Sequence, residues 1–496
     1  MTTSPIITEN LASQRLAVNG ELPRFWRMNR LEAYYWGWQY EDLKYSWTDH
    51  YGLDANGLKV AVGMYQRKPK MLVSLPKAMV NAVVSFLFSR GRFPDVISED
   101  EGAQEWIKYF MKKAKVAKVA KQVAALGNIV GSVFWTFQVI NGKFSLKAYN
   151  GKVCYPTFAS EDDDEPISVL IRFKFKDNSG VWRWFQKLYD QNRIVNYDQP
   201  LWITDDTPIF NEIESNEHGL GFVPGVWIRN MDAELPFHGG MFDGVGLYDD
   251  EGALRHFDAI NYLASQFDRS LHYNLDPQLV LKKLTQADYD RCLAKSPIAP
   301  WVMGDGEAQL LEATGNTFDK AETRLKTMIA TVCQMQSVIL LDPTEIDIKA
   351  DSSKALERLY APMLTLIDSQ RGNYGDEGIA ALISKMLRAV DILKTRGFKI
   401  LKEDDPGVAI KTDEVSLSWG DYFDRTPEDM KSDIERVSMA VNSNLLSDES
   451  AVKYIASDFA IEDIAAEMER LEAQKAARIS AFSSGPDSGA DFSEDQ

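Results

Sequence analysis

Residues 253–274, ALRHFDAINYLASQFDRSLHYN, and residues 316–339, NTFDKAETRLKTMIATVCQMQSVI, decide the fold of this chain. In both stretches apolar side chains recur at alternating spacings of three and four, which places them on one side of an α-helix. Neither stretch contains Gly or Pro, so each predicts an unbroken helix of roughly 33 to 36 Å at about 1.5 Å per residue. We expect the two helices to pack as a hairpin through apolar positions that include Phe257, Ile260, Phe267, Leu325, Met328 and Val332.

The other positions of these two helices are polar, among them Asp258, Ser265 and Asp268 on the first and Lys320 and Arg324 on the second. A polar face of this kind suits a helix that lies between water and neighbouring subunits. The same pattern also fits an ordinary hairpin in the core of one domain. Periodicity alone leaves both interpretations open.

Length and charge limit the class of protein. A chain of 496 residues is too long for one compact core, so we expect two to four structural regions. The net charge of −18, from 55 basic and 73 acidic residues, argues against a protein that reads nucleic-acid sequence, which would show a basic face. It is compatible with a protein that DNA passes without sticking. Residues 426–496 hold 16 acids and 6 bases and form a separate electrostatic region.

The cysteines and the N-terminus indicate a reducing cytosol. Cys154, Cys292 and Cys333 lie far apart without paired spacing, so the sequence predicts neither a disulfide framework nor a thiolate metal site. The N-terminal sequence has no apolar segment behind a basic start, and no apolar run reaches 18 residues. We therefore expect neither a signal peptide nor a membrane span.

Before Gly127 the sequence shows an aromatic-rich segment and predicts two helices. Eight aromatic residues crowd into positions 26–47 and are expected to pack against a partner surface, another domain or a local core. A helix over 76–90 begins at Pro76, and a second is expected over about 99–126. The second helix carries lysines that face either phosphate or solvent, namely Lys108, Lys112, Lys113, Lys115, Lys118 and Lys121.

After Gly127 the apolar spacing changes to two, which predicts a β-rich region. Asn141-Gly142 marks a hairpin turn, and further strands are expected over 167–176, 181–189 and 193–204. The segment between the two long helices has the pattern of a small subdomain of its own. It predicts a strand near 277–281, a short helix near 286–295 and a strand near 308–313.

A third long helix is expected to begin at Asp351, Ser352 or Ser353. It contains Pro362 and then Gly372, Gly375 and Gly378, so we expect it to kink or break there and to resume over 379–396. Thr426-Pro427-Glu428-Asp429 then predicts the start of a helical region that reaches about residue 480. The Ser-, Gly- and Asp-rich residues 481–496 are expected to be a disordered tail.

No motif for catalysis or for cofactor binding is complete. No Gly-Lys-Ser or Gly-Lys-Thr is present to hold phosphates, and His238-Gly239-Gly240 has no G-x-S-x-G nucleophile to accompany it. The five histidines never form a metal-spaced pair. We therefore predict no enzyme, no catalytic residue, no cofactor and no metal site. A soluble carboxylate-dependent hydrolase with a helical accessory domain remains the alternative, since scattered carboxylates leave no motif.

The order of several weak motifs resembles the portal proteins of long-tailed double-stranded DNA bacteriophages over roughly residues 75–475. The resemblance rests on the following segments: Gly221-Phe222-Val223-Pro224 with Asn230, Asp258-Ala259-Ile260-Asn261 with Ser265 and Asp268, Pro277-Gln278-Leu279-Val280-Leu281, Ser353-Lys354-Ala355-Leu356 with Pro362, Leu446-Ser447-Asp448-Glu449-Ser450, and Glu467-Met468-Glu469-Arg470. The aromatic N-terminus and Gly246-Leu247 depart from the family pattern.

The resemblance implies an α+β, mainly helical portal-type fold that assembles as a ring. Its parts would be an α/β wing over 1–245, stem helices over 246–273 and 316–339, an α/β clip over 274–315, a tunnel loop over 340–352, a long kinked helix returning to the wing over 353–425, a helical crown over 426–480 and the tail over 481–496. The tunnel loop would line the DNA channel with Asp342, Glu345, Asp347 and Lys349.

The same resemblance implies a place in the virion, at the portal vertex of the capsid, after assembly in the host cytoplasm. A homo-oligomeric ring of about twelve subunits would form the channel for DNA packaging and ejection. Double-stranded DNA would pass non-specifically. The expected protein partners are the terminase large subunit, the major capsid and scaffolding proteins and the head-tail connector, and no membrane is expected.

Overall fold

The computed structural model describes residues 24–88, 92–140, 142–160, 165–202, 209–231, 243–275, 278–282, 307–311, 316–340, 353–396, 406–423, 427–443, 445–455, 468–471 and 473–474. The chain divides into two compact units, Met1–Asp342 with Pro362–Gly420 and Pro343–Ala361 with Asp421–Gln496. The division falls inside one helix, α8, whose first turns count with the second unit.

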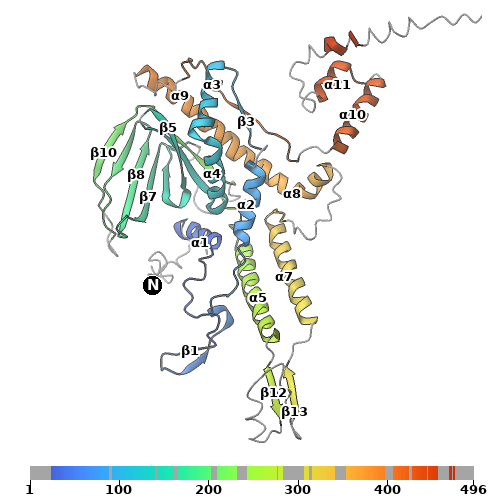
Figure 1. Cartoon of the computed structure of the whole chain (residues 1–496). Helices are drawn as coiled ribbons and strands as arrows, with labels where there is room; N and C mark the ends of the chain where they lie inside the picture. The colour runs from blue at the N-terminus through green and yellow to red at the C-terminus, as the bar shows by residue number, and fades with distance from the viewer. Residues whose placement is uncertain are drawn as a thin grey trace, which may run out of the picture. The chain divides into compact units, whose positions relative to one another are not determined.

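The first unit combines helices with several small antiparallel sheets (Figure 1). Its helices are α1 (Arg24–Trp36), α2 (Leu75–Phe88), α3 (Glu101–Tyr109), α4 (Val116–Val130), α5 (Glu251–Leu275), α7 (Asn316–Met335), the second half of α8 (Ser353–Arg371) and α9 (Ala381–Thr395). Its strands are β1 (Tyr51–Leu53), β2 (Lys59–Ala61), β3 (Asp95–Ile97), β4 (Ser132–Ile140), β5 (Lys143–Asn150), β6 (Cys154–Thr157), β7 (Ser168–Lys176), β8 (Trp182–Asp190), β9 (Arg193–Tyr197), β10 (Glu212–Glu217), β11 (Gly225–Arg229), β12 (Gln278–Lys282), β13 (Glu307–Leu311) and β14 (Ser416–Ser418). The class is therefore α+β, as the sequence predicts.

Two of these sheets enclose the core of the β-rich region. One has the strand order β11-β4-β5 and the other β10-β9-β8-β7-β6. Between them lies a cluster of buried side chains to which both sheets contribute: Phe134, Cys154, Val169, Ile171, Tyr189, Val223 and Trp227. Alternation along the strands sends one side chain in two into this layer, which is why the sequence shows a period of two here.

One predicted hairpin and the two strands predicted in the insert are confirmed. β4 and β5 pair antiparallel from Ile140 opposite Lys143 to Val133 opposite Asn150, and Gly142 supplies the positive φ of +76° that the turn requires. β12 and β13 pair antiparallel within the insert, with Gln278 opposite Leu311. The short helix expected near 286–295 lies outside the described residues.

The single helix expected over about 99–126 is wrong. The chain instead forms α3, a π-helical segment at Phe110–Ala114 and α4. Between the last two, Lys115 has φ +57° and ψ +43°, a left-handed conformation that no α-helix accepts. The six lysines therefore do not share one straight helix face.

The third long helix does not break at its glycines. α8 contains Pro362, a π-helical segment follows at Gly372–Ala380, and α9 continues from there. Gly375 lies against Trp419 and Gly378 against Ile228, so closely that an added Cβ would stand 2.7 Å and 3.0 Å from those side chains. The glycines allow close packing here, and the predicted interruption takes the form of a wider helical turn.

The described part of the second unit is helical, as expected. It contains α10 (Pro427–Asn442), α11 (Asp448–Ile455) and the first turns of α8. Arg436 on α10 donates a 2.8 Å hydrogen bond to the hydroxyl of Tyr454 on α11. The rings of Tyr360 and Phe423 stand 5.5 Å apart. Residues 481–496, expected to be a tail, lie outside the described residues.

Candidate functional site

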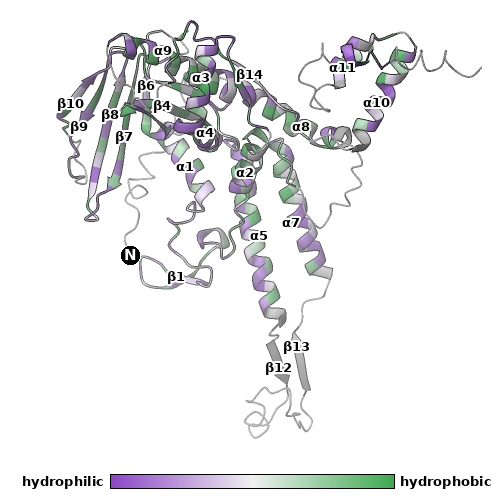
Figure 2. Cartoon of the chain, turned by 45° about the horizontal axis from the view of Figure 1, so that its top comes forward, coloured by the Kyte–Doolittle hydropathy of each residue, from purple (hydrophilic) through white to green (hydrophobic). Residues whose placement is uncertain are grey.

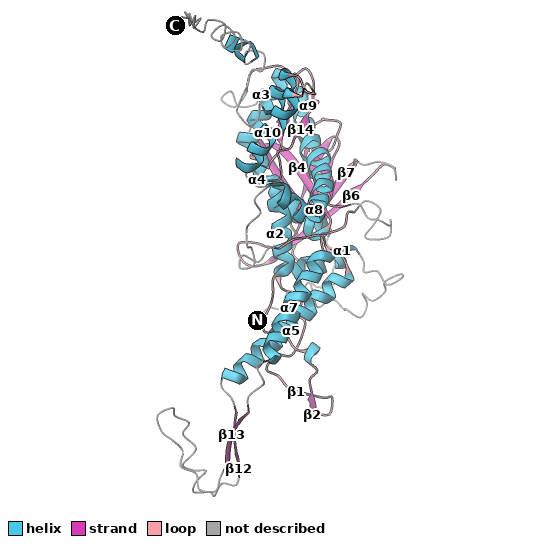
Figure 3. Cartoon of the chain, turned by 90° about the vertical axis from the view of Figure 1, so that its right-hand side faces the viewer, coloured by secondary structure: helices cyan, strands magenta, loops and turns pink. Residues whose placement is uncertain are grey.

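The two helices that the opening pattern predicts are present and lie side by side (Figure 3). The helix expected from residue 246 begins at Glu251, because the Asp250 carboxylate caps it by accepting hydrogen bonds of 3.1 Å from the amides of Gly252 and Ala253. Just before this cap the chain makes a turn that is fastened to α4, with the Leu247 amide donating to the Asn128 carbonyl at 2.7 Å.

The apolar positions of the two helices have different neighbours. Phe267 meets Phe318 edge to face at 6.0 Å, and Val332 is fully buried, whereas Leu325 and Met328 are only half-buried. Phe257 and Ile260 are buried, and the Phe257 ring contacts Tyr34 and Tyr248. Within one chain α5 is therefore covered on two sides and α7 on one.

The polar face of α5 does not form a wall toward water. The chain's own N-terminal arm, which we define as residues 24–73, lies along it. The carboxylate of Asp258 accepts hydrogen bonds from the hydroxyls of Tyr34 at 2.9 Å and Tyr40 at 2.6 Å. The expectation that this face is reserved for water and neighbours is wrong for these residues.

The next turns of α5 hold the backbone of the arm. The Asn261 Oδ1 accepts from the Val73 amide at 2.8 Å, and the Ser265 hydroxyl accepts from the Met71 amide at 2.9 Å. Both α5 side chains are buried. Because an extended segment leaves its amides without helical partners, these two side chains supply acceptors for the partly buried amides of the arm.

Aromatic and charged contacts complete the attachment of the arm. Tyr40, Trp47 and Tyr262 form a buried cluster, so part of the aromatic N-terminus is a local core. Two ion pairs, Arg30 with Glu251 and Lys70 with Asp268 at 2.8 Å, flank this cluster. Arg269 is also hydrogen-bonded to the His50 ring at 3.1 Å. Trp36 and Trp38 stack on each other and remain about half exposed.

Burial and hydrogen bonding shift the pKa values of these acids in opposite directions. Burial raises the pKa of Asp258 above its ordinary value, and the two phenols offset only part of that effect. The hydrogen bond from Lys70 lowers the pKa of Asp268, and the one from Arg30 lowers that of Glu251. Since each of these carboxylates is engaged by the arm, the arrangement fastens two segments together and presents no free acid-base pair.

A second buried polar network joins the β-rich region to the long helix. Asn230 Oδ1 accepts from the Tyr374 hydroxyl at 2.7 Å and from the Gln370 side-chain amide at 3.2 Å. Gln370 also bonds Asn128 at 2.8 Å, and the Asn230 side-chain amide donates to the Val245 carbonyl at 2.9 Å. Asn230, Asn128 and Gln370 are completely buried.

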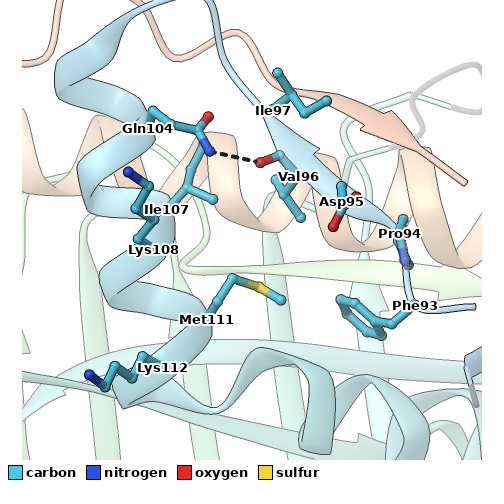
Figure 4. A pocket seen from close by; sticks show the side chains of 10 residues that line it. All are labelled: Phe93, Pro94, Asp95, Val96, Ile97, Gln104, Ile107, Lys108, Met111 and Lys112. Carbon is cyan, nitrogen blue, oxygen red and sulfur yellow. Dashed lines mark hydrogen bonds between the residues drawn. The ribbon is translucent and has the colours of Figure 1, made fainter. Parts of the chain in front are cut away.

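A groove of about 780 Å³ lies between α3 and β3 (Figure 4). Apolar side chains such as Ile107 and Met111 form part of its wall, and Lys108 and Lys112 come from the same helical stretch. Gln104 closes one side by donating to the Val96 carbonyl at 3.2 Å. Lys108 is paired with Glu105 at 2.7 Å, and the charged side chains Asp95 and Lys112 also line the groove.

The described residues hold no group of three or more potential metal ligands. Cys154 and Cys333 are buried, and burial raises the pKa of the Cys333 thiol to about 11. No described helix combines the length and the apolar character that crossing a membrane requires. The tunnel-loop residues Asp342, Glu345, Asp347 and Lys349 lie outside the described residues.

The sequence did not point to the partners of the motif residues. The order of the motif singled out Asp258, Asn261, Ser265 and Asp268. It did not reveal that these side chains bind Tyr34, Tyr40, Lys70 and the backbone amides of Met71 and Val73. The only available signal was the coincidence of a crowded aromatic segment with one polar helix face.

Comparison with known protein families identifies the class of protein. The family described as "Phage portal protein, SPP1 Gp6-like" matches residues 18–478, so the chain belongs to the phage portal protein family. No curated relative matches it.

Two solved structures resemble the chain at low sequence identity. They are described as "Neck of empty GTA particle computed with C6 symmetry", with 12% identity and a TM-score of 0.37, and "Virion of native gene transfer agent (GTA) particle", with 9% identity and a TM-score of 0.35. In each case 77% of this chain and 88% of the other chain are covered.

Proposed function

We propose that this chain is the subunit of a ring at one capsid vertex that forms the channel for DNA packaging and ejection. Membership of the portal family supports the class, since the family is structural. The observation that carries the proposal is the hairpin of α5 and α7. α5 is covered by the arm and by α7, while the apolar stripe of α7 is left half-covered at Leu325 and Met328.

A ring explains why α7 is only half covered. A head-to-tail contact repeats around a closed ring, so the uncovered side of α7 in each subunit can meet a different surface of the next. We propose about twelve subunits, the number that the family resemblance implies. The division into wing, stem, clip, tunnel loop, long helix and crown belongs to the same proposal.

The channel surface is proposed to repel DNA. The tunnel loop over 340–352 carries Asp342, Glu345, Asp347 and Asp351 against Lys349, so each subunit contributes a charge of −3. About twelve copies would give a collar of roughly −36, which keeps the phosphate backbone from binding. DNA would then pass the ring non-specifically.

The proposed partners are those of a particle vertex. The terminase large subunit would dock to drive DNA inward, the major capsid and scaffolding proteins would surround the ring, and the head-tail connector would bind after packaging. The protein would assemble in the host cytoplasm, reside in the virion and act without catalysis or a cofactor.

Oligomeric state tests this proposal directly. Size exclusion coupled to light scattering should show about twelve protomers, and negative-stain images should show rings with a central channel. A strict monomer at micromolar concentration, with folded far-UV circular dichroism, would contradict the assignment.

A further inference from the structure

The groove between α3 and β3 has an apolar floor that the chain itself leaves open. Pro94, Val96 and Ile107 are buried at its bottom. Phe93 and Met111 are half-buried and extend toward each other across it (Figure 4). The volume of about 780 Å³ falls within the roughly 300 to 1,000 Å³ of typical ligand sites. The hollow is therefore large enough to take a few apolar side chains of a partner.

One wall of the groove is the edge of a strand. β3 pairs with β14 along its other edge. On the groove side, the side-chain amide of Gln104 donates to the Val96 carbonyl at 3.2 Å and accepts from the Ser98 amide at 2.8 Å. One carboxamide thus takes the place that the backbone of a neighbouring strand would fill. An extended peptide laid beside β3 would continue this pairing.

A row of lysines begins at the rim of this groove. Lys108 and Lys112 line the groove on its helix side. Beyond the turn at Lys115 the row continues on α4, whose first turns carry hydrophilic residues (Figure 2). Four exposed lysines pair with no acid in the part of the chain that the structure describes: Lys112, Lys115, Lys118 and Lys121. On a chain with a net charge of −18, an uncompensated basic strip therefore extends from the groove.

The acids nearby lie at the start of α3 or on the other wall of the groove. Glu101 and Glu105 belong to the first turns of α3, and Glu105 neutralises Lys108. Asp95 is exposed on the strand wall. Residues 106–130 contain no Asp or Glu. The charge thus changes sign along the helix side of the groove, from acidic at the start of α3 to basic at Lys112.

We infer that this groove binds an extended, acidic peptide segment of a partner protein. Apolar side chains of the segment fill the hollow between Met111 and Phe93, its backbone lies beside β3, and its acids meet Lys112 and the lysines of α4. Double-stranded DNA is also acidic, but it offers neither apolar side chains for the hollow nor a backbone that pairs with a strand edge. The inference goes beyond the proposed ring and does not depend on it.

Fluorescence polarisation with a defined probe tests the groove. The probe is a short fluorescein-labelled peptide in which Glu alternates with Leu, because alternation places the acids on one side of an extended chain and the apolar groups on the other. Three competitors are compared with it: the same peptide with Ser for Leu, the same peptide with Lys for Glu, and short duplex DNA. We expect the Glu-Leu peptide to bind at least about tenfold more tightly than each of the three.

Matched lysine variants locate the charged half of the site. Lys112→Glu with Lys118→Glu should weaken binding of the probe at least about tenfold, because each change replaces an attraction by a repulsion. Lys44→Glu with Lys59→Glu makes the same change in net charge at exposed positions of the N-terminal arm. This second pair should leave binding of the probe unchanged.

Methionine variants test the apolar half of the site. Met111→Gln keeps a similar length but makes the wall of the hollow polar, and it should weaken binding of the probe at least about fivefold. Met439→Gln, at a position 68% exposed on α10, is the matched control and should have no effect. Far-UV circular dichroism checks that every variant folds.

Each outcome decides for or against the inference. Equal binding of the Leu and Ser peptides would reduce the site to a patch of charge and overturn the inference, as would DNA that binds as tightly as the probe. Equal losses from the two lysine pairs would also overturn it, because long-range charge alone would then explain binding. No binding of the probe up to about 1 mM would refute it outright. None of these results bears on ring formation, which light scattering measures separately.

Discussion

The hydroxyl of Tyr40 donates a 2.6 Å hydrogen bond to Oδ1 of Asp258, a residue 218 positions later in the chain. Tyr34 donates to the other oxygen, Oδ2, at 2.9 Å. Both oxygens of one carboxylate on α5 are thus used by the N-terminal arm. This contact assigns a physical role to the Asp258 to Asn261 motif: it holds the arm in place along the helix that leads to the insert.

Removing this carboxylate should loosen the arm. Asp258→Ala leaves two largely buried phenols without an acceptor, and we expect the free energy of unfolding to fall by about 2 kcal/mol. Urea unfolding followed by tryptophan fluorescence measures the change. Asp268→Ala is the matched control, because its pair with Lys70 is exposed, and it should change stability little. Equal losses for the two variants would contradict this role of Asp258.

The same carboxyl should give a pH dependence of known sign. Folding raises the pKa of Asp258 through burial, beside Tyr34, Tyr40, Arg30 and Glu251. At pH values just above the ordinary pKa of Asp, the folded chain therefore binds more protons than the unfolded chain. The contribution of Asp258 to stability consequently falls as the pH rises through the raised pKa. The stability difference between wild type and Asp258→Asn should shift against wild type over that interval. Parallel unfolding curves at all pH values would contradict the shift.

Asn230 should be among the most sensitive positions in the β-rich region. Asn230→Ala removes the acceptor of the Tyr374 hydroxyl and of the Gln370 amide in a fully buried site. We expect a loss of about 2 to 4 kcal/mol in thermal or urea unfolding. Asn196→Ala, which removes an exposed bond to Glu214, should cost far less. A small effect at Asn230 would mean that water replaces its partners.

A charge on the apolar stripe of α7 should block assembly. Leu325 is half-buried in one chain, so Leu325→Asp should leave the β-rich region folded but prevent rings if the neighbour covers this side. Light scattering and circular dichroism separate the two effects. Truncation after residue 480 is the contrasting variant, because that tail has no apolar periodicity, and it should form rings normally. Rings from Leu325→Asp would contradict the proposed interface.

Reversing the charge of the tunnel loop should slow the passage of DNA through the ring. Glu345→Lys with Asp347→Lys would create phosphate contacts, each steepening the salt dependence by roughly 0.9. Rings should form unchanged, while packaging should slow most at low ionic strength, where screening is weakest. A packaging assay at two salt concentrations provides the measurement. Unchanged rates at both, with rings confirmed by imaging, would refute the repulsive collar.

The features that the sequence predicted well are those encoded within a few residues. α5 and α7 follow from alternating spacings of three and four, and the β4–β5 turn follows from a Gly at the position that needs a positive φ. The order of weak motifs was sufficient to identify the portal family. The break at Lys115 was missed because no Gly or Pro marks it, and a Lys in the left-handed conformation carries no signal of its own.

Only the tertiary structure decided which surfaces the chain covers with itself. A helical pattern shows that Asp258, Asn261 and Ser265 share a polar face, but water, a neighbour or the same chain can satisfy such a face equally well. The contacts with Tyr40 and Val73 span roughly two hundred positions, and hydrogen bonds at that separation leave no periodicity in the sequence. Local composition thus determined the elements and the family, while long-range packing determined that α5 is covered by the arm on one side and by α7 on another.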